Sequence, residues 1–460
     1  MNVSNAVATS ILVLLSMSWP LIAQARGGEL AEPRASQVEA FAKEAAGAVP
    51  GLCVLVVDHD QVVYRKAYGL ADLQNRVQMT PECSFRIGSL TKQFTAVAIL
   101  QLVDQGKLSL DDNVTQYLPN LPAGYGRIKL RHLLAHTSGI PDYTDIPGWP
   151  KLAREDRSPN ELLALVRDRP LEFQAGHDWH YSNTNYVILG AVIEKVTDQS
   201  YAAYLKTHVF DPAEMTNTVY GDGSNVAHRA RGYMHAANKS QDADPISISN
   251  AYAAGGLTST VNDLWKWEQS LSSGRLIPRH LLVQARSENR LTDGRGTGYG
   301  FGWGVATLDG HATLEHGGRI PGFQSYEIRV VDAGVFVAVL VNTDDEAAKP
   351  DRLALRIART LLDDRTPSLS IAPEDAKQYV GTYISAGGAA MRFILDGGVL
   401  TLDDHGRHWP LTRVADNEFV SKRDVRHFKF KTGRDGHPDK LLVHPRLGVE
   451  QLFARNDRFK

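Results

Sequence analysis

Residues 85–106 read FRIGSLTKQFTAVAILQLVDQG and predict a helix that starts with a serine and a lysine one turn apart. Apolar side chains recur at helical spacing, at Phe94, Val97, Leu100 and Val103. Gly106 follows the last of them and is placed to end the helix. Ser89 would therefore lie near the helix N-terminus, with Lys92 on the same face.

This Ser-x-x-Lys pair has the chemistry of a nucleophile and its base. A serine hydroxyl attacks a carbonyl only when a base within hydrogen-bond reach takes its proton. A lysine amine can serve if burial or a nearby positive charge lowers its pKa from about 10.4. Free amides at the helix N-terminus can also stabilise an oxyanion. A serine that caps the helix, together with a solvated lysine, would show the same spacing and remains the alternative.

A second polar segment, WHYSNTNY at residues 179–186, leads into a short apolar run. A Tyr-x-Asn pair can place a phenol for proton transfer and an amide to hold a substrate carbonyl. Tyr181 and Asn183 are the candidates for these roles. The alternative is a loop tyrosine followed by an asparagine that caps a helix.

A third segment, HGGR at residues 316–319, precedes a pair of strands. Paired glycines allow a backbone to approach a ligand closely, and a histidine can orient or polarise that ligand. His316, Gly317 and Gly318 are therefore candidate substrate-binding residues, and a glycine turn before a strand is the alternative.

Strand patterns occur near both ends of residues 26–365, around a largely helical middle. Hairpins are predicted at residues 51–64 and 326–341, and a helix at 351–362. Strands at both ends with helices between them predict an α+β domain in which one antiparallel sheet unites the first and last thirds.

The C-terminal part has a different sequence pattern. Residues 366–376 read as a linker, and residues 377–460 contain about eight short alternating runs separated by turns such as Asp396-Gly397-Gly398. This pattern predicts a small antiparallel β-barrel or sandwich as a separate domain.

Residues 1–25 carry no charged side chain, contain a short apolar run and end in Ala-Gln-Ala, a small-x-small cleavage pattern. They predict a secretory signal peptide and hence an exported protein, periplasmic or secreted. An uncleaved membrane anchor is the alternative. The apolar run is interrupted by Ser16, Ser18 and Pro20 and would span a bilayer poorly, so we expect no stable membrane insertion after cleavage.

Composition excludes several other classes of function. The 460 residues carry 50 Lys and Arg against 52 Asp and Glu, a formal net charge of −2 that offers no basic field for nucleic acid. Cys53 and Cys83 allow one disulfide or two buried thiols. His132 and His136 have helical i, i+4 spacing but no third ligand, so we expect no metal and no other cofactor.

The three motifs, in this order, resemble the serine beta-lactamase and penicillin-binding protein superfamily, and within it the class C-like branch. The segments RHLLAHTSGI at residues 131–140 and AGGL at 254–257 are typical of that branch. The C-terminal region resembles the lipocalin-like domain attached to some members.

This resemblance implies a role for each motif residue. Ser89 matches the nucleophile that becomes acylated, and Lys92 matches its basic partner. Tyr181 matches the tyrosine that passes a proton to the leaving group or activates the deacylating water. Asn183 matches the amide that positions the substrate.

The strand motif departs from the pattern of many beta-lactamases. His316 stands where those enzymes have a lysine, and it supplies a full positive charge only at lower pH. Arg319 could restore a cation at this place. The resemblance implies an oxyanion hole formed by the backbone N–H groups of Ser89 and Arg319.

The sequence therefore predicts an exported serine hydrolase that forms an acyl-enzyme. It would act on D-amino-acid peptide or amide bonds or on small esters, as a D-aminopeptidase, a D,D-carboxypeptidase or an esterase. A true beta-lactamase is one alternative, and a penicillin-binding or ligand-binding protein with little turnover is another. The expected partner is a small-molecule or peptide substrate, and the oligomeric state stays open.

Overall fold

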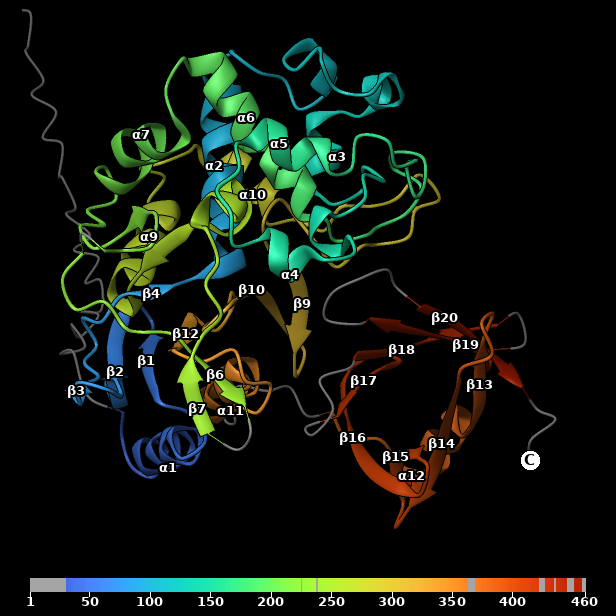
Figure 1. Ribbon diagram of the computed structural model, residues 1–460. Coiled ribbons are helices and arrows are strands. Elements are labelled where there is room, and N and C mark those ends of the chain that lie inside the picture. Colours follow the sequence, from blue (N-terminus) through green and yellow to red (C-terminus); the bar gives the residue numbers. More distant parts are fainter. Residues whose placement is uncertain are drawn as a thin grey trace, which may run out of the picture.

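The computed structural model describes residues 30–224, 226–236, 239–362, 369–421, 427–433, 436–444 and 451–456. It consists of a seven-stranded sheet, helices on both faces of that sheet, and a closed C-terminal barrel (Figure 1). The predicted signal peptide, residues 1–25, lies outside the described residues, and so do residues 366–368 of the predicted linker.

One antiparallel sheet combines strands from the beginning and the end of residues 30–362, which confirms the predicted α+β fold. Its order is β3-β2-β1-β12-β11-β10-β9. The strands are β1 (Gly51–Asp58), β2 (Gln61–Asp72), β3 (Val77–Gln78), β9 (Gly304–Leu308), β10 (His311–Ile320), β11 (Phe323–Val330) and β12 (Val335–Val341). Central strand β1 pairs with β12, so that Val54 lies opposite Val339.

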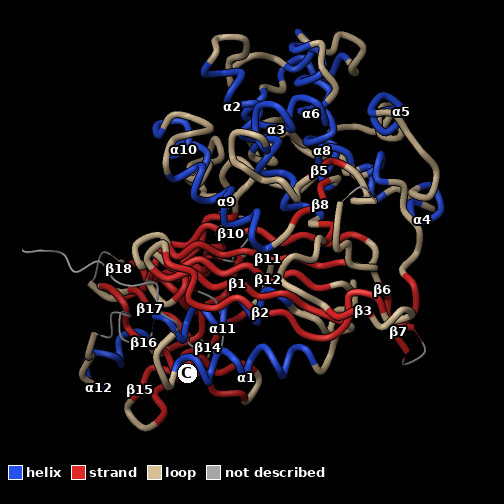
Figure 2. The backbone as a smooth tube through the Cα atoms, turned by 90° about the vertical axis from the view of Figure 1, so that its left-hand side faces the viewer, coloured by secondary structure: helices blue, strands red, loops and turns tan. Residues whose placement is uncertain are grey.

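Strand β1 is apolar without interruption because both of its faces are covered. Leu52, Val54 and Val56 pack toward α1 (Arg34–Ala46) and α11 (Pro350–Leu362). Cys53 and Leu55 face the opposite core, toward the helical region (Figure 2). Both cysteines are buried free thiols, which decides between the two alternatives left open by the sequence.

The helical region lies on the other face of the sheet, around the buried helix α2 (Thr91–Asp104). Its other helices are α3 (Leu130–Leu134), α4 (Trp149–Leu152), α5 (Pro159–Ala164), α6 (Asn183–Thr197), α7 (Tyr201–Leu205), α8 (Tyr252–Gly255), α9 (Val261–Ser272) and α10 (Arg279–Ala285). Trp267 of α9 stacks on Phe94 of α2, with 4.1 Å between ring centroids. Among the described helices, none is both long and apolar enough to cross a bilayer.

Smaller elements connect these layers. A three-stranded sheet contains β4 (Phe85–Arg86), β8 (Leu257–Ser259) and β5 (Val219–Tyr220), and a hairpin contains β6 (Tyr233–Ala236) and β7 (Lys239–Asp242). Short 3-10 or π turns lie at Gly88–Leu90 (η1), Val114–Gln116, Ala123–Arg127, Tyr143–Asp145, Lys206–Phe210, Ile248–Asn250 and Lys377–Tyr379.

The C-terminal strands form a closed barrel in sequential order, preceded by α12 (Pro373–Ala376). The strands are β13 (Gly381–Ser385), β14 (Ala390–Asp396), β15 (Val399–Asp404), β16 (Arg407–Ala415), β17 (Glu418–Ser421), β18 (His427–Thr432), β19 (Pro438–His444) and β20 (Gln451–Asn456). Of the two predicted architectures, the structure has the barrel rather than the sandwich. Its core is packed with aromatic side chains: Tyr379, Tyr383, Phe393, Phe419, Phe428, Phe430 and Phe453.

The barrel contacts residues 30–362 at α11 and at the turn between β9 and β10. Arg359 of α11 donates hydrogen bonds to Asp309 in that turn, at 3.0 Å, and to the carbonyl oxygen of Ser421 in the barrel, at 3.4 Å. A Cβ atom at Gly310 would lie 3.1 Å from Val414 of β16, which shows how closely the two parts approach.

Candidate active site

Ser89 lies in η1, the single 3-10 turn that leads from β4 into α2. Gly88 has a φ of +53°, and a Cβ atom there would lie only 2.8 Å from the backbone nitrogen of Arg319. A glycine is therefore required where the turn meets β10. Ser89 does not act as the helix cap, because the N-cap of α2 is Leu90 and has no side-chain cap. The capping alternative is thus wrong.

Lys92 is fully buried and points back toward Ser89. Its Nζ atom donates to Ser89 Oγ at 3.0 Å, to Asn183 Oδ1 at 2.7 Å and to the carbonyl oxygen of Ala254 at 2.9 Å. Burial lowers the pKa of Lys92 to about 7, and the negative charge of Asp142 opposes this decrease. The alternative of a solvated lysine is therefore wrong.

The three partners of Lys92 decide where its lone pair points. The oxygens of Asn183 and Ala254 only accept hydrogen bonds, so they take up the two N–H bonds of the neutral amine. The Ser89 hydroxyl is the one partner of the three that can also donate. In the unprotonated state the lone pair of Lys92 consequently faces the hydroxyl, which is the geometry a general base needs.

Tyr181 lies beside Lys92 in the structure, although the two residues are far apart in the chain. Its ring centroid is 4.7 Å from Lys92 Nζ, and Tyr181 lies two residues before the start of α6. Burial raises the pKa of Tyr181, and a hydrogen bond with Ser89 opposes this increase. The phenol therefore stays protonated at neutral pH and can donate a proton.

Asn183, the first residue of α6, has both ends of its side-chain amide engaged inside the protein. Its Oδ1 accepts from Lys92, while its Nδ2 and its backbone N–H donate to Asp142 at 2.8 and 3.0 Å. Asn183 thus links the Lys92 amine to the buried carboxylate of Asp142. We expected it to hold a substrate carbonyl, and that role stays a prediction.

Asp142 also belongs to this group of residues, although no sequence motif marked it. It lies two residues beyond the HTSGI segment, and its contact with the first residue of α6 depends on the tertiary fold. A carboxylate at a helix N-terminus is favoured by the helix dipole, and here it also faces the buried amine.

His316 of β10 is buried and neutral. Its Nδ1 donates to the carbonyl oxygen of Gly317 at 2.6 Å, because a carbonyl can only accept, and its Nε2 therefore accepts from the Tyr299 hydroxyl at 2.9 Å. Burial and the charge of Lys92 lower the pKa of His316 to about 3. At neutral pH His316 therefore supplies no positive charge at this position.

The side chain of Arg319 extends away from this position. Its guanidinium donates to the carbonyl oxygen of Asp344 at 2.9 Å and lies 3.5 Å from the carboxylate of Glu346. Its backbone belongs to a free strand edge, since β9 pairs with β10 only over residues 311–315. A Cβ atom at Gly318 would lie 2.0 Å from the carbonyl oxygen of Ile87, so this glycine lets the edge approach the Ser89 turn.

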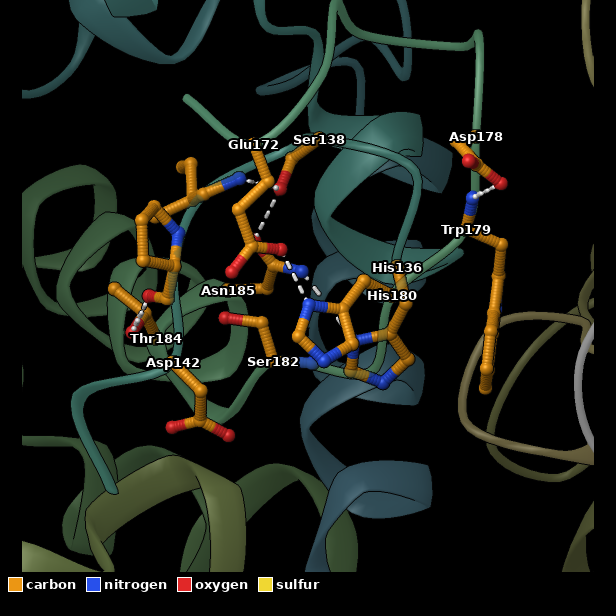
Figure 3. A network of polar contacts seen from close by, with 12 residues as sticks. His136, Ser138, Asp142, Glu172, Asp178, Trp179, His180, Ser182, Thr184 and Asn185 are labelled. Atoms are coloured by element: carbon orange, nitrogen blue, oxygen red, sulfur yellow. Dashed lines mark hydrogen bonds and ion pairs between the residues drawn. The ribbon is translucent and has the colours of Figure 1, made fainter. Parts of the chain in front are cut away.

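His132 and His136 do not form the helical pair that their spacing suggested. Helix α3 ends at Leu134, and His136 has a left-handed φ of +59°. His132 instead accepts from the backbone N–H of Lys129 at 3.2 Å, and His136 lies beside Tyr181, with 4.3 Å between ring centroids. Figure 3 shows the polar network around His136.

The comparison with known proteins agrees with this geometry. The family model described as Beta-lactamase matches residues 36–362. Penicillin-binding protein 4* of Bacillus subtilis (strain 168) is 28% identical over 384 residues, 77% of this chain and 84% of that protein. D-amino acid amidase from Ochrobactrum anthropi SV3 is similar in structure, with a TM-score of 0.64, 25% identity and coverage of 72% of this chain and 99% of that chain.

A third relative extends over nearly the whole molecule. The octameric penicillin-binding protein homologue from Pyrococcus abyssi has a TM-score of 0.63 and 25% identity, and it covers 91% of this chain and 99% of its own. The chain belongs to the beta-lactamase family and is a serine hydrolase related to the penicillin-binding proteins.

Proposed function

We propose that the chain hydrolyses amide or ester bonds by two successive acyl transfers at Ser89. The observation that carries this proposal is the Lys92 amine, which is buried, has a pKa of about 7 and lies 3.0 Å from Ser89 Oγ. Lys92 takes the hydroxyl proton as Ser89 Oγ attacks the substrate carbonyl. The backbone N–H groups of Ser89 and Arg319 stabilise the oxyanion.

The second half of the reaction releases the enzyme. Tyr181 gives its proton to the leaving amine or alcohol as the bond to the carbonyl carbon breaks, and an acyl-enzyme remains on Ser89. Water then attacks the ester and gives a proton to the Tyr181 phenolate, while Lys92 returns its proton to Ser89 Oγ as the bond to the carbonyl carbon breaks and the acid leaves.

For the substrate we propose the amide or peptide bond of a D-amino acid, or a small ester. Two structural neighbours support this class: the D-amino acid amidase, and a D-stereospecific amidohydrolase from Streptomyces sp. with 28% identity and a TM-score of 0.59. The neutral His316 also favours substrates that present no carboxylate to β10. A strict beta-lactamase is the weaker candidate for the same reason.

We propose in addition that the enzyme is exported. The uncharged residues 1–25 and the small-x-small pattern at 23–25 support cleavage after Ala25. N-terminal sequencing of the protein from periplasm and culture medium should show Arg26 as the first residue. A product that keeps Met1 would contradict the cleavage.

The test of the function is the variant Ser89→Ala. We expect it to lower kcat/KM by more than about 1,000-fold and to abolish labelling by a fluorophosphonate probe. The substrate panel contains nitrocefin, a p-nitrophenyl ester, a D-Ala-D-Ala peptide and a D-amino-acid amide. Ser84→Ala is a matched control, because this serine lies five residues earlier and its hydroxyl has no partner among the described residues. Undiminished turnover in Ser89→Ala would remove Ser89 from the role.

A further inference from the structure

Both backbone amides that flank Tyr181 donate to one residue, His136. The N–H of His180 donates to the His136 carbonyl oxygen at 3.0 Å, and the N–H of Ser182 donates to His136 Nδ1 at 3.1 Å (Figure 3). The His136 ring also stacks on the Tyr181 ring, with an interplanar angle of 30°. His136 therefore contacts Tyr181 on its ring and holds the chain on either side of it.

The local backbone makes this double contact possible. His136 follows the end of α3 and has a φ of +59°, a conformation that residues other than glycine, asparagine, aspartate and histidine seldom adopt. Had α3 continued, the carbonyl of residue 136 would have pointed along the helix axis, toward the following turn. The left-handed residue instead lets the carbonyl and the ring reach the same loop.

The His136 ring is neutral, and its tautomer follows from its neighbours. Its Nδ1 accepts from Ser182 and also from the side-chain amide of Asn185 at 3.3 Å, so the proton resides on Nε2. Burial and the charge of Lys92 hold the pKa of His136 well below its usual range. A protonated ring would have to give up the Ser182 bond and would repel Lys92.

We propose that His136 is a positioning residue, which holds the Tyr181 phenol in line with Ser89 and Lys92 for proton transfer. This inference rests on the proposed function, because it requires Tyr181 to act in turnover. Misplacing a catalytic group by about 1 Å costs on the order of 100-fold in rate, so a loose Tyr181 should reduce kcat rather than weaken substrate binding.

The test is a double-mutant cycle of His136→Asn and Tyr181→Phe. Asparagine tolerates the left-handed backbone and retains an acceptor for the Ser182 N–H, but it has no ring to stack on Tyr181. We expect His136→Asn to lower kcat about 10- to 100-fold with KM changed less than about threefold. In the Tyr181→Phe background the same change should cost less than about threefold, since the group being positioned is already absent.

His132→Asn is the matched control. His132 is a partly buried histidine that also accepts a backbone N–H in the same segment, but no contact with Tyr181 is found among the described residues. It should keep the kcat of the wild type. If His136→Asn does not fold, His136→Gly replaces it in the cycle, because glycine also adopts the left-handed backbone and has no ring.

The outcomes separate the two proposals. Equal losses from the His136 variant in both backgrounds, or wild-type kcat in a folded His136 variant, would overturn the positioning role alone. A fully active Tyr181→Phe would contradict the role of Tyr181 in the proposed function, and with it the inference. Loss of labelling in Ser89→Ala is independent of both results.

Discussion

The Lys92 side chain has a lowered pKa because folding removes it from water. An exposed amine has a pKa of about 10.4 and is almost wholly protonated at neutral pH. Between α2, α6 and α8 the ammonium loses its hydration, and the pKa decreases to about 7. Asp142 limits the decrease and reaches the amine through the amide of Asn183.

The pH dependence of turnover should report this base. In the proposed mechanism the unprotonated amine is the active form, so kcat/KM should rise about tenfold per pH unit up to about 7 and then level off. Asp142→Asn removes the charge that raises the pKa of Lys92 and should move the midpoint to lower pH. Ester hydrolysis measured from pH 5 to 9 checks both expectations. Asp145→Asn serves as a control, and a midpoint that moves upward in Asp142→Asn would contradict the assignment.

His316 should determine how the enzyme treats substrates with a carboxylate. In His316→Lys an ammonium would have the Tyr299 hydroxyl and the Gly317 carbonyl oxygen as acceptors. We expect kcat/KM for a penicillin, relative to an uncharged p-nitrophenyl ester, to rise about tenfold, or about 1.4 kcal/mol. The neutral variant His316→Gln should leave this ratio unchanged. An equal rise in both variants would show that charge is not the cause.

At the level of elements, α2 and β11 are joined by a buried polar network behind the active site. Gln93, next to Lys92 on α2, donates to Glu327 of β11 at 2.5 Å and accepts from Trp267 Nε1 of α9 at 2.9 Å. Burial raises the pKa of Glu327 to about 7, and the nearby carboxylate of Glu268 adds to the increase. The folded protein therefore favours the protonated acid.

Because of this network, the free energy of unfolding should depend on pH. The folded pKa of Glu327 lies above its unfolded value of 4.5, so the folded state loses stability as the pH rises between 4.5 and about 7. Glu327→Gln keeps a neutral side chain and should be more stable than the wild type at pH 8 by about 1–3 kcal/mol, an advantage that disappears near pH 4. Urea unfolding at both pH values measures it. A variant that is less stable at pH 8 would refute the linkage.

On the scale of the whole molecule, the barrel and the active site lie at opposite ends of β10. The barrel approaches the turn at Gly310, whereas Arg319 lies nine residues along the chain, about 30 Å of extended strand. The barrel core is occupied by its own aromatic side chains. These observations favour a structural role for the barrel over a role in shaping the cleft.

Breaking the contact between the two parts should therefore affect stability and leave selectivity alone. Arg359→Ala removes the bonds to Asp309 and Ser421 and leaves a carboxylate that is 5% exposed without its cation. We expect a loss of about 2–4 kcal/mol in the free energy of unfolding, with unchanged ratios of kcat/KM across the substrate panel. Arg352→Ala, at an exposed position of the same helix, should cost less than about 0.5 kcal/mol. Altered selectivity in Arg359→Ala would instead link the barrel to the cleft.

The sequence alone determined the features that depend on local patterns. Helical spacing and Gly106 marked α2, the strand patterns at residues 51–64 marked the β1–β2 hairpin, and short alternating runs marked the barrel strands. The order of the motifs singled out Ser89, Lys92 and Tyr181, which the structure brings together. The helix and strand predictions were confirmed because periodicity and turn chemistry are properties of neighbouring residues.

Only the tertiary structure decided what surrounds each group. Periodicity placed His136 on a helix with His132, but α3 ends first, and the left-handed residue turns toward the Tyr181 loop. Asp142 and Tyr299 joined the site through contacts with Asn183 and His316. Burial and hydrogen-bond partners set the protonation state of an ionisable group, and both come from segments far apart in the chain. Folding therefore lowers the pKa of the Lys92 amine and keeps His316 neutral.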